Sequence, residues 1–299
     1  MERWQIVATC VFITLVVYGL GRFTLHQLLS FLLFHPLVGG DPLILRPGTQ
    51  DYTVRVRVAR QSALQVLYVA ATPAARTRTH PTHPIILYSY GNAGNLASRQ
   101  TELWELSTAL QMDIVSYDPR GFGLSTRAKP TADTWLADGQ AVYTWLHQRY
   151  PHRPIIAWGC SLGGAVAAQL ALQSGVVGIV MQTTFARTSD VIQYVLPRPL
   201  CFVRFAPLID WLLPPGYRLR STEALARAHK PTLVLHARHD ELMSLDTAQQ
   251  LCAVNPPMTT YHEIIGTHND YSLHEPASLK VIQEFLEAIR RTLIVSGRP

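Results

Sequence analysis

The stretch AWGCSLGGAVAAQLAL (157–172) decides the fold. A short apolar run ends there in small residues around one serine, and small, helix-compatible residues follow. The pattern is G-x-S-x-G, with Gly159 and Gly163 two residues on either side of Ser161. Glycine at these positions leaves room for a sharp strand-to-helix turn that exposes the serine hydroxyl beside a helix N-terminus. We therefore predict a nucleophile elbow at Ser161, and a structural turn with a spare serine is the alternative.

Outward from this turn, short strand-like segments alternate with helical ones over most of the chain. Short buried strands separated by helices indicate a mostly parallel sheet with helices on both faces. The first two segments alternate with period two, as in an antiparallel pair. We predict an α/β fold with an eight-stranded sheet. The expected strands are 52–59, 63–71, 85–90, 113–118, 154–159, 176–183, 232–238 and 259–265, and the expected helices include 97–111, 131–149 and 276–293.

A serine nucleophile needs a base, and the base needs a carboxylate that orients it. On this type of fold the chain order is serine, acid, histidine. Asp240 lies two residues beyond a late strand, in TLVLHARHDELMS (232–244), and is the predicted acid. Glu241 and Asp246 are its rivals, but Asp246 is better placed to cap the helix that follows.

The predicted base is His268, which follows the last strand on a glycine-bearing loop in YHEIIGTHNDYS (261–272). His262 lies within that strand and is expected to be structural, and His239 adjoins the acid and is expected to point away. Three suitable residues at three strand ends, in the expected order, predict a Ser161–Asp240–His268 catalytic triad.

An acyl-transfer site also needs backbone N–H groups aimed at the developing oxyanion. One is expected from Leu162, directly after the nucleophile. The other is expected from the loop SYGNAGNLAS (89–98), whose small residues let the backbone approach a substrate, and Asn92 is the predicted donor. An ordinary Asn-Gly turn is the alternative interpretation of that loop.

These residues carry a family resemblance. The chain resembles the α/β-hydrolase superfamily from about residue 45 to 295. Its motifs resemble one branch of membrane-anchored or membrane-associated serine hydrolases with little or no cap domain. The resemblance implies relatives such as depalmitoylases and lysophospholipid or monoacylglycerol lipases, bordering on aminopeptidase-like serine hydrolases. The motifs are YGNAGN (90–95), YDPRGFGLS (117–125), GCSLGG (159–164), HARHDELM (236–243) and GTHND (266–270).

One position departs from the branch. Tyr90 stands where the branch commonly has histidine at the start of the oxyanion loop, so the side-chain contacts that hold this loop are expected to differ. The block from Asp118 to Ser125 is expected to be a structural loop beside the site. Within it, Arg120 is expected to pair with Asp118, and contact with an anionic headgroup is the alternative.

The N-terminus departs from globular composition. Residues 4–21, WQIVATCVFITLVVYGLG, carry no charge and as a helix span roughly 27 Å, close to the hydrocarbon core of a bilayer. We expect residues 1–38 to be a membrane anchor, interrupted at Arg22 and followed by an interfacial or domain-packed segment; a cleaved signal peptide is the alternative. Basic residues after the apolar stretch outnumber those before it, which favours a cytoplasmic catalytic domain.

Residues 39–299 are expected to form the catalytic domain, with a short cap-like insertion at 185–229. In YVLPRPLCFVRFAPLIDWLLPPGYRLR (194–220), apolar residues recur near helical spacing. They are expected either to cover the core or to contact acyl chains and the bilayer. In the second case, Arg204, Arg218 and Arg220 would lie near phosphates.

Composition limits the function classes. Hydrophobic residues make up 48% of the 299 residues and charged residues 15%, which permits a large core and argues against disorder. The net charge of +6 comes from scattered residues, without a basic block or nucleic-acid motif, so nucleic-acid binding is not expected. The four cysteines have no disulfide or zinc spacing, and loop histidines such as His83 lack further ligands, so no metal or other cofactor is expected.

The predicted function is a membrane-anchored serine hydrolase that cleaves esters or thioesters through an acyl-enzyme. A lipid or an acylated small molecule or protein is the expected substrate, because the anchor, the short insertion and the basic bias suit substrates presented by a bilayer. The alternatives are a serine peptidase-like hydrolase of the same fold and a non-catalytic binding protein of that fold.

Overall fold

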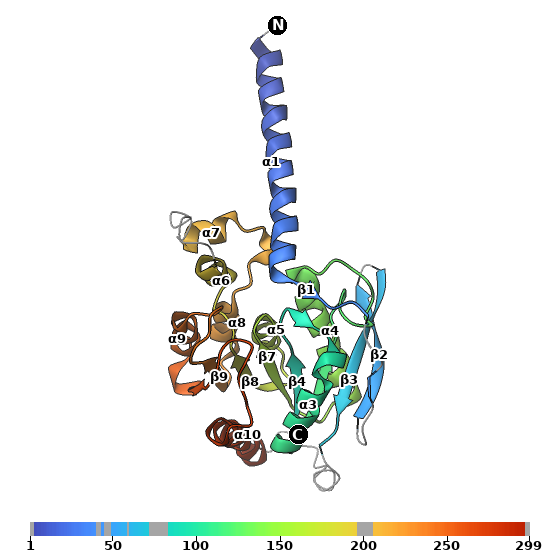
Figure 1. Cartoon of the computed structure of the whole chain (residues 1–299), viewed down its shortest axis with the longest axis vertical. Coiled ribbons are helices and arrows are strands. Elements are labelled where there is room, and N and C mark those ends of the chain that lie inside the picture. The colour runs from blue at the N-terminus through green and yellow to red at the C-terminus, as the bar shows by residue number, and fades with distance from the viewer. Residues whose placement is uncertain are drawn as a thin grey trace.

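The computed structural model describes residues 3–39, 43–44, 49–58, 60–71, 83–195 and 206–296. Its centre is an eight-stranded sheet with the order β10-β9-β8-β7-β4-β6-β3-β2 (Figure 1). Neighbouring strands are parallel except where β3 pairs with β2 and β6. The strands are β2 (Thr49–Val58), β3 (Arg60–Val69), β4 (Ile85–Ser89), β6 (Asp113–Tyr117), β7 (Ile155–Cys160), β8 (Val176–Gln182), β9 (Thr232–Ala237) and β10 (Thr259–Ile264). The predicted fold class is confirmed.

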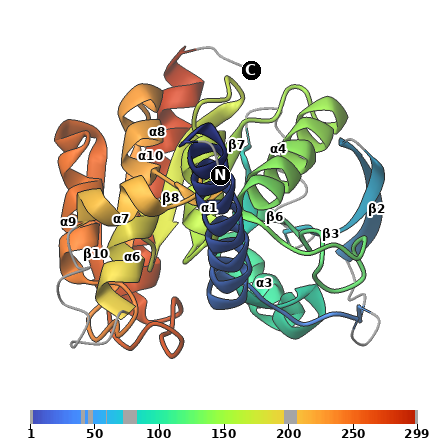
Figure 2. The same cartoon turned by 90° about the horizontal axis from the view of Figure 1, so that it is seen from above.

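Helices cover both faces of the sheet, and Figure 2 shows α3 and α4 on opposite sides of it. On one side, α4, α5, α8 and α9 contact one another in series, and on the other α3 contacts α10. The central strands β4, β7 and β9 are buried along their whole length, as a sheet covered on both faces requires. The helices are α3 (Leu96–Leu110), α4 (Ala132–Arg149), α5 (Gly163–Leu170), α8 (Ser221–Ala228), α9 (Leu245–Ala253) and α10 (Pro276–Ser296).

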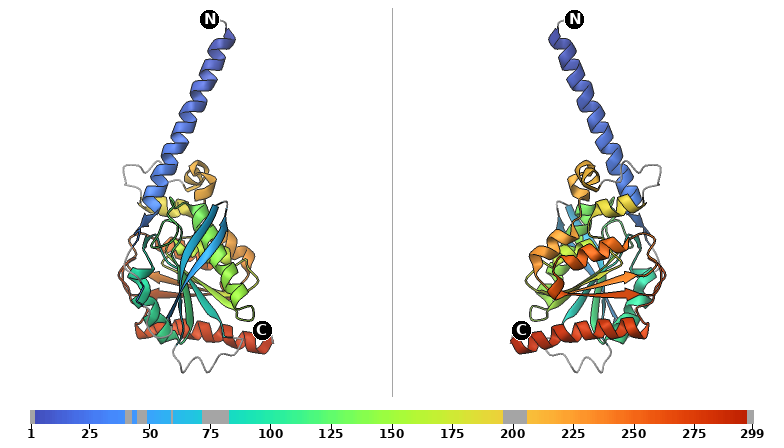
Figure 3. Two further views of the ribbon diagram at one scale, coloured as in Figure 1. Left: turned by 90° about the vertical axis from the view of Figure 1, so that its right-hand side faces the viewer. Right: turned by 90° about the vertical axis from the view of Figure 1, so that its left-hand side faces the viewer.

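The N-terminal segment is one continuous helix, α1 (Arg3–Leu33), which projects from the domain on the side opposite α10 (Figure 3). The helix continues through Arg22, whose guanidinium lies 5.9 Å from the Tyr18 ring centre, one turn back along the helix. Residues Thr9–Phe31 are long and apolar enough to cross a membrane by length and composition, with a mean hydropathy of 1.4.

The last turns of α1 pack on the domain. A domain-packed segment was one of the two alternatives predicted for this stretch. The Ser30 hydroxyl hydrogen-bonds to the Tyr217 hydroxyl, and the Tyr217 ring meets the His26 ring edge-on with centroids 5.1 Å apart. Phe34, just past the helix, is buried 5.4 Å from the Trp135 ring. The helix base is therefore fixed by aromatic and polar contacts to α4 and to the short 3-10 turn Pro215–Tyr217.

The stretch after β8 contains α6 (Thr188–Val195) and α7 (Ala206–Leu212). On α7, Ile209 is buried and covers the core, whereas Leu208, Trp211 and Leu212 are exposed. Arg218 donates to the carbonyls of Trp211 and Leu213 at the end of α7, and Arg220 pairs with Glu223 at 2.7 Å. Phe202, Arg204 and Phe205 lie outside the described residues.

Candidate active site

The turn between β7 and α5 holds Ser161 in a left-handed backbone conformation, with φ of 49°. The glycines around it allow close approach: a Cβ on Gly159 would lie 2.3 Å from the Gly163 carbonyl oxygen, and one on Gly163 would lie 1.9 Å from that of Ser89. The Ser161 N–H donates to the Gln182 carbonyl at 2.9 Å, and the Thr184 hydroxyl donates to the Ser161 carbonyl at 2.6 Å. The end of β8 and the turn after it thus hold the strained residue in place.

The structure brings the three predicted residues together at the carboxyl edge of the sheet. His268 Nε2 lies 3.0 Å from Ser161 Oγ, and His268 Nδ1 lies 2.9 Å from both carboxylate oxygens of Asp240. All three side chains are buried. This is the hydrogen-bonded order that a nucleophile, a base and an orienting carboxylate require.

The Asp240 carboxylate is fixed by its own loop. Its Oδ1 accepts from the N–H groups of Leu242 and Met243 at 2.9 and 2.7 Å. The rival acid Glu241 does not contact the histidine ring; its carboxylate accepts the backbone N–H of His268 at 2.9 Å. The other rival, Asp246, lies in the first turn of α9, whose N-cap is Ser244 rather than the expected Asp246.

A tight loop after β10 presents His268. Gly266 has φ of 134°, and a Cβ there would lie 2.2 Å from the Asp270 carbonyl oxygen. The Gly266 carbonyl accepts the His239 N–H at 3.0 Å, which ties this loop to the loop of the acid. His262 contacts the Ser278 hydroxyl at 3.1 Å, away from the triad, as expected of a structural side chain.

The loop after β4 lies against the nucleophile. A Cβ on Gly91 would lie 3.2 Å from the Ser161 Cβ, so Asn92 follows directly after the point of contact. Among the residues that the structure describes, no acceptor contacts the backbone N–H of Asn92 or of Leu162. Neither N–H group is therefore used in the hydrogen bonding of the described part of the fold.

Tyr90 holds the start of this loop in place of the branch's usual histidine. Its hydroxyl donates to Asp118 Oδ1 at 2.6 Å, and the same oxygen accepts the Leu96 N–H at 2.7 Å. Complete burial raises the pKa of Tyr90 well above its ordinary value, with the neighbouring Asp118 charge adding to the shift, so the phenol stays a donor. From α3, Arg99 donates to the Ala93 carbonyl at 3.0 Å and lies over the Tyr90 ring.

The expected pairing of Arg120 with Asp118 is wrong. Arg120 Nε bonds to Asp138 Oδ1 on α4 at 2.6 Å, and the Arg120 N–H donates to Asp138 Oδ2 at 2.7 Å. Asp118 instead accepts hydrogen bonds from the Tyr90 hydroxyl and the Leu96 N–H. Both members of the Arg120–Asp138 pair are buried, so the role of Arg120 is structural, as expected, but with a different partner.

Sequence reasoning missed a polar network beneath the nucleophile. The Tyr271 hydroxyl lies 3.3 Å from Cys160 Sγ and accepts from the Gln182 side-chain amide. Gln182 in turn accepts the Trp158 indole N–H at 2.6 Å. A signal was available, because Gln182 is a polar residue at the carboxyl end of an otherwise apolar strand, where functional groups gather.

His236, also missed, lies on β9 beneath the triad. Burial lowers its pKa, opposed by the nearby Asp240 charge and assisted by His268. The imidazole is therefore neutral near pH 7 and adds no cation that would compete for the Asp240 carboxylate.

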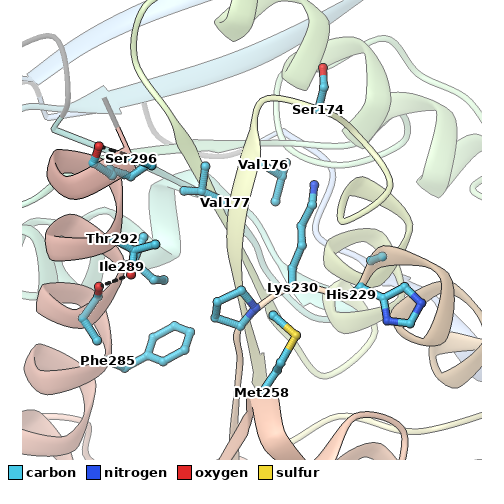
Figure 4. A pocket seen from close by; sticks show the side chains of 14 residues that line it. Ser174, Val176, Val177, His229, Lys230, Met258, Phe285, Ile289, Thr292 and Ser296 are labelled. Carbon is cyan, nitrogen blue, oxygen red and sulfur yellow. Dashed lines mark hydrogen bonds between the residues drawn. The ribbon is translucent and has the colours of Figure 1, made fainter. Parts of the chain in front are cut away.

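A separate cavity of about 490 Å³ lies at the opposite, amino edge of the sheet, between α10 and the starts of β8 and β9 (Figure 4). Its wall is mainly apolar, with Val177, Phe285 and Ile289 facing Lys230 and Met258. None of the three triad residues lines it. Within the described ranges, no cluster of His, Cys, Asp or Glu side chains is arranged to hold a metal ion.

The fold and the strand-end site define the class of protein. The chain has the α/β-hydrolase fold, and residues 84–202 match the family model described as alpha/beta hydrolase fold. The esterase Pf2001 of Pyrococcus furiosus superposes with a TM-score of 0.61 over 86% of this chain and 96% of that one, at 17% identity. The predicted resemblance to serine hydrolases of the α/β-hydrolase superfamily is confirmed.

The chain is also similar in sequence to other proteins. The lysophosphatidylserine lipase ABHD12 of Rattus norvegicus is 26% identical over 226 residues, which cover 68% of this chain and 56% of that protein. The uncharacterized protein MT2364 of Mycobacterium tuberculosis is 29% identical over 213 residues, which cover 70% and 69%. The match thus spans little more than half the length of the lipase relatives.

Proposed function

We propose that the protein is a membrane-anchored serine hydrolase that cleaves carboxylic esters or thioesters. The supporting observation is the continuous chain of hydrogen bonds from Ser161 Oγ through the His268 ring to Asp240, at 3.0 and 2.9 Å. The α/β-hydrolase fold and the lipase relatives add support for ester hydrolysis.

In the proposed mechanism, Ser161 Oγ attacks the acyl carbonyl while His268 Nε2 takes its proton. Asp240 accepts a hydrogen bond from His268 Nδ1, which fixes the tautomer and stabilises the imidazolium that forms. The N–H groups of Leu162 and Asn92 hold the tetrahedral oxyanion. His268 then protonates the leaving group, and a water activated by His268 releases the acyl group from the serine.

We infer a lipid or lipid-like acyl substrate presented at a membrane. The printed name of the rat relative is a lysophosphatidylserine lipase, which supports lysophospholipids as the first class to test. Helix α1 supports anchoring by its length. Exposed apolar side chains occur in the segment that follows it, in the loop hydrogen-bonded to that segment and on α7: Leu37, Leu124 and Trp211 are 52%, 59% and 73% exposed. Figure 1 places α7 on the same side of the domain as α1.

We place the catalytic domain on the cytoplasmic side, because basic residues are more frequent after the apolar helix than before it. Residues 1–38 are proposed as a retained anchor, 39–299 as the catalytic domain and 185–229 as its cap-like insertion. Protease protection tests the orientation in sealed vesicles whose cytoplasmic face points outward. Protease added outside should digest the domain, and digestion only after the vesicles are opened contradicts this placement.

Labelling with a fluorophosphonate probe tests the hydrolase proposal, because the probe reacts with activated serines. The full-length protein should label, and Ser161→Ala should neither label nor hydrolyse an aryl ester. Ser189→Ala, at a serine outside the triad, is the matched control and should retain both properties. Absence of labelling in a folded wild-type protein would instead favour a non-catalytic binding role.

A substrate panel tests the finer proposal. Lysophospholipids, palmitoyl-peptides, short aryl esters and aminoacyl-anilides should be compared by kcat/KM with the same preparation. We expect lipid esters or thioesters to exceed the short soluble esters. A preference confined to short esters contradicts the lipid proposal, and faster anilide cleavage supports the peptidase-like alternative.

A further inference from the structure

The chain that follows α1 runs directly against the oxyanion loop. Residues 34–39, which we call the strap, contain β1 (His35–Pro36), which pairs in parallel with β5 (Ala93–Gly94). The His35 N–H donates to the Asn92 carbonyl at 2.8 Å, on the residue proposed as an oxyanion donor. The Asn95 side-chain amide donates back to the Gly39 carbonyl at 2.8 Å. The strap is therefore hydrogen-bonded to the residues on both sides of Ala93–Gly94, namely Asn92 and Asn95.

The strap is held from its other side by the loop that contains Gly123. The Gly123 N–H donates to the Leu37 carbonyl at 2.9 Å, and the Gly39 N–H donates to the Gly123 carbonyl at 2.8 Å. A Cβ on Gly123 would lie 1.8 Å from Asp118 Oδ2, so this loop is packed against the carboxylate that receives Tyr90. The strap thus lies between two loops that border the nucleophile.

The start of the strap is fixed to the end of α1. The Phe34 N–H donates to the Ser30 carbonyl at 3.1 Å, so the helical turn continues into the strap. Phe34 packs on Trp135, whose ring lies 6.3 Å from that of Tyr90, the first residue of the oxyanion loop. A continuous series of contacts therefore connects the end of α1 to Tyr90 at the start of this loop and to residues 92–95 within it.

The oxyanion loop needs such external support. Its residues 91–94 are small, Gly94 has φ of 80°, and the exposed Ala93 side chain anchors nothing. Glycine-rich backbone has many accessible conformations unless it is bonded elsewhere. The Asn92 N–H must nevertheless stay pointed at the site, because pre-oriented donors stabilise the oxyanion without reorganisation.

We propose that the strap positions the oxyanion loop, so that the N-terminal helix belongs to the catalytic apparatus and is more than a membrane anchor. The inference rests on the proposed hydrolase function. In this view the strap residues contact no substrate; they act through the backbone of Asn92.

Two full-length variants test the proposal. His35→Pro removes the N–H that bonds to Asn92, and Asn95→Asp keeps the acceptor that caps α3 while replacing the donor to Gly39 with a carboxylate. Ile294→Ala is the control, since its side chain lies on α10, away from the strap, and is 65% exposed. The readouts are kcat and KM for a soluble aryl ester and the inhibition constant of a trifluoromethyl ketone, whose serine adduct carries an oxyanion.

Loss of one oxyanion donor costs about 10²–10³ in kcat, so a displaced donor should cost about tenfold or more. We expect both variants to lose kcat and ketone affinity by similar factors, with KM nearly unchanged. The Ile294→Ala control should behave like wild type. Wild-type kcat and ketone affinity in a folded Asn95→Asp protein would overturn the proposal, as would a change confined to KM.

Amide hydrogen exchange separates this inference from the proposed function. Exchange over residues 91–95 should be faster in both variants than in wild type, whatever the protein catalyses. An inactive wild-type protein would refute the hydrolase proposal alone, whereas unchanged exchange at 91–95 would refute the strap.

Discussion

At the scale of single residues, Ser161 shows how the chain places a hydroxyl where ordinary backbone would not. A serine at φ of 49° is disfavoured, and it persists because Gln182 and Thr184 bind its backbone on both sides. The bonding partners come from β8 and the turn after it, far along the chain from the elbow. The G-x-S-x-G pattern therefore predicted the turn but not the groups that hold it.

Replacing the neighbouring carboxylates of Asp240 and Glu241 should have different effects on activity. Asp240→Asn should lower kcat for an aryl ester by about 10⁴, because the amide stabilises the wrong imidazole tautomer. Glu241→Gln keeps an oxygen that can accept the His268 N–H, so it should retain most activity. Steady-state kinetics of the two variants checks this, and a larger loss from Glu241→Gln would reverse the assignment of the acid.

Residue identity was predictable where chemistry restricts the choice. Ser161, Asp240 and His268 each follow a strand in the predicted order, and the structure brings their side chains within hydrogen-bond distance. The partner of Arg120 was not predictable: Asp118 is near in sequence, but the bond is made by Asp138, which lies within α4. Tyr271 was missed because its contact with Cys160 depends on how the His268 loop folds back.

At the scale of elements, β6 is joined to its surroundings through Asp113. This carboxylate accepts from Tyr68 at 2.7 Å, from the Ala71 N–H at 2.7 Å and from Arg153 at 2.6 Å. Burial opposes ionisation, but the Arg153 charge and these hydrogen bonds together leave the pKa of Asp113 below its ordinary value. The charged form is therefore the one that stabilises the sheet edge.

Asp113→Asn should lower the free energy of unfolding at pH 7 by about 1–3 kcal/mol, the usual worth of hydrogen bonds to a charged group. Because the folded pKa is depressed, the wild-type advantage is present above about pH 4 and disappears as the pH falls through the folded value. Denaturant unfolding at pH 7 and pH 3 checks this. An advantage that grows on acidification would contradict the assigned direction.

Helix α1 shows the limit of reading elements from composition. Arg22 interrupts the uncharged run of sequence but not the helix, and its side chain extends back over Tyr18. The packing of its last turns on Tyr217 and Trp135 involves residues more than 100 positions away. Only the assembled fold brings them together.

At the scale of the whole molecule, α1 and α7 lie on the carboxyl side of the sheet, whereas α10 lies at the far end (Figures 1 and 3). Trp211→Glu should reduce hydrolysis of vesicle-borne lysophospholipid by about fivefold or more, because burial of an aromatic side chain in lipid is worth over about 1 kcal/mol. Hydrolysis of a soluble aryl ester should not change.

Val295→Glu is the matched control, since Val295 is 87% exposed at the end of α10. It should leave both reactions unchanged in the same proteoliposomes. Equal effects of the two variants on the vesicle substrate would show that the face around α1 is not the one that meets the membrane.

The layered fold was predictable as a whole because each buried strand is a short apolar run between helical segments. The eight strands lie within a few residues of their predicted positions. The two-residue strands β1 and β5 were not foreseen, since so short a pairing depends on where α1 ends. They are also the elements that join the anchor to the site.

The central claim is acyl transfer to Ser161, and the most direct measurement traps that intermediate. Full-length protein should be quenched with acid during turnover of an aryl ester and its peptides analysed by mass spectrometry. We predict the acyl group on the peptide that carries Ser161, and none in His268→Ala. Turnover with no acylated Ser161 peptide, or with the acyl group on another residue, would contradict the account.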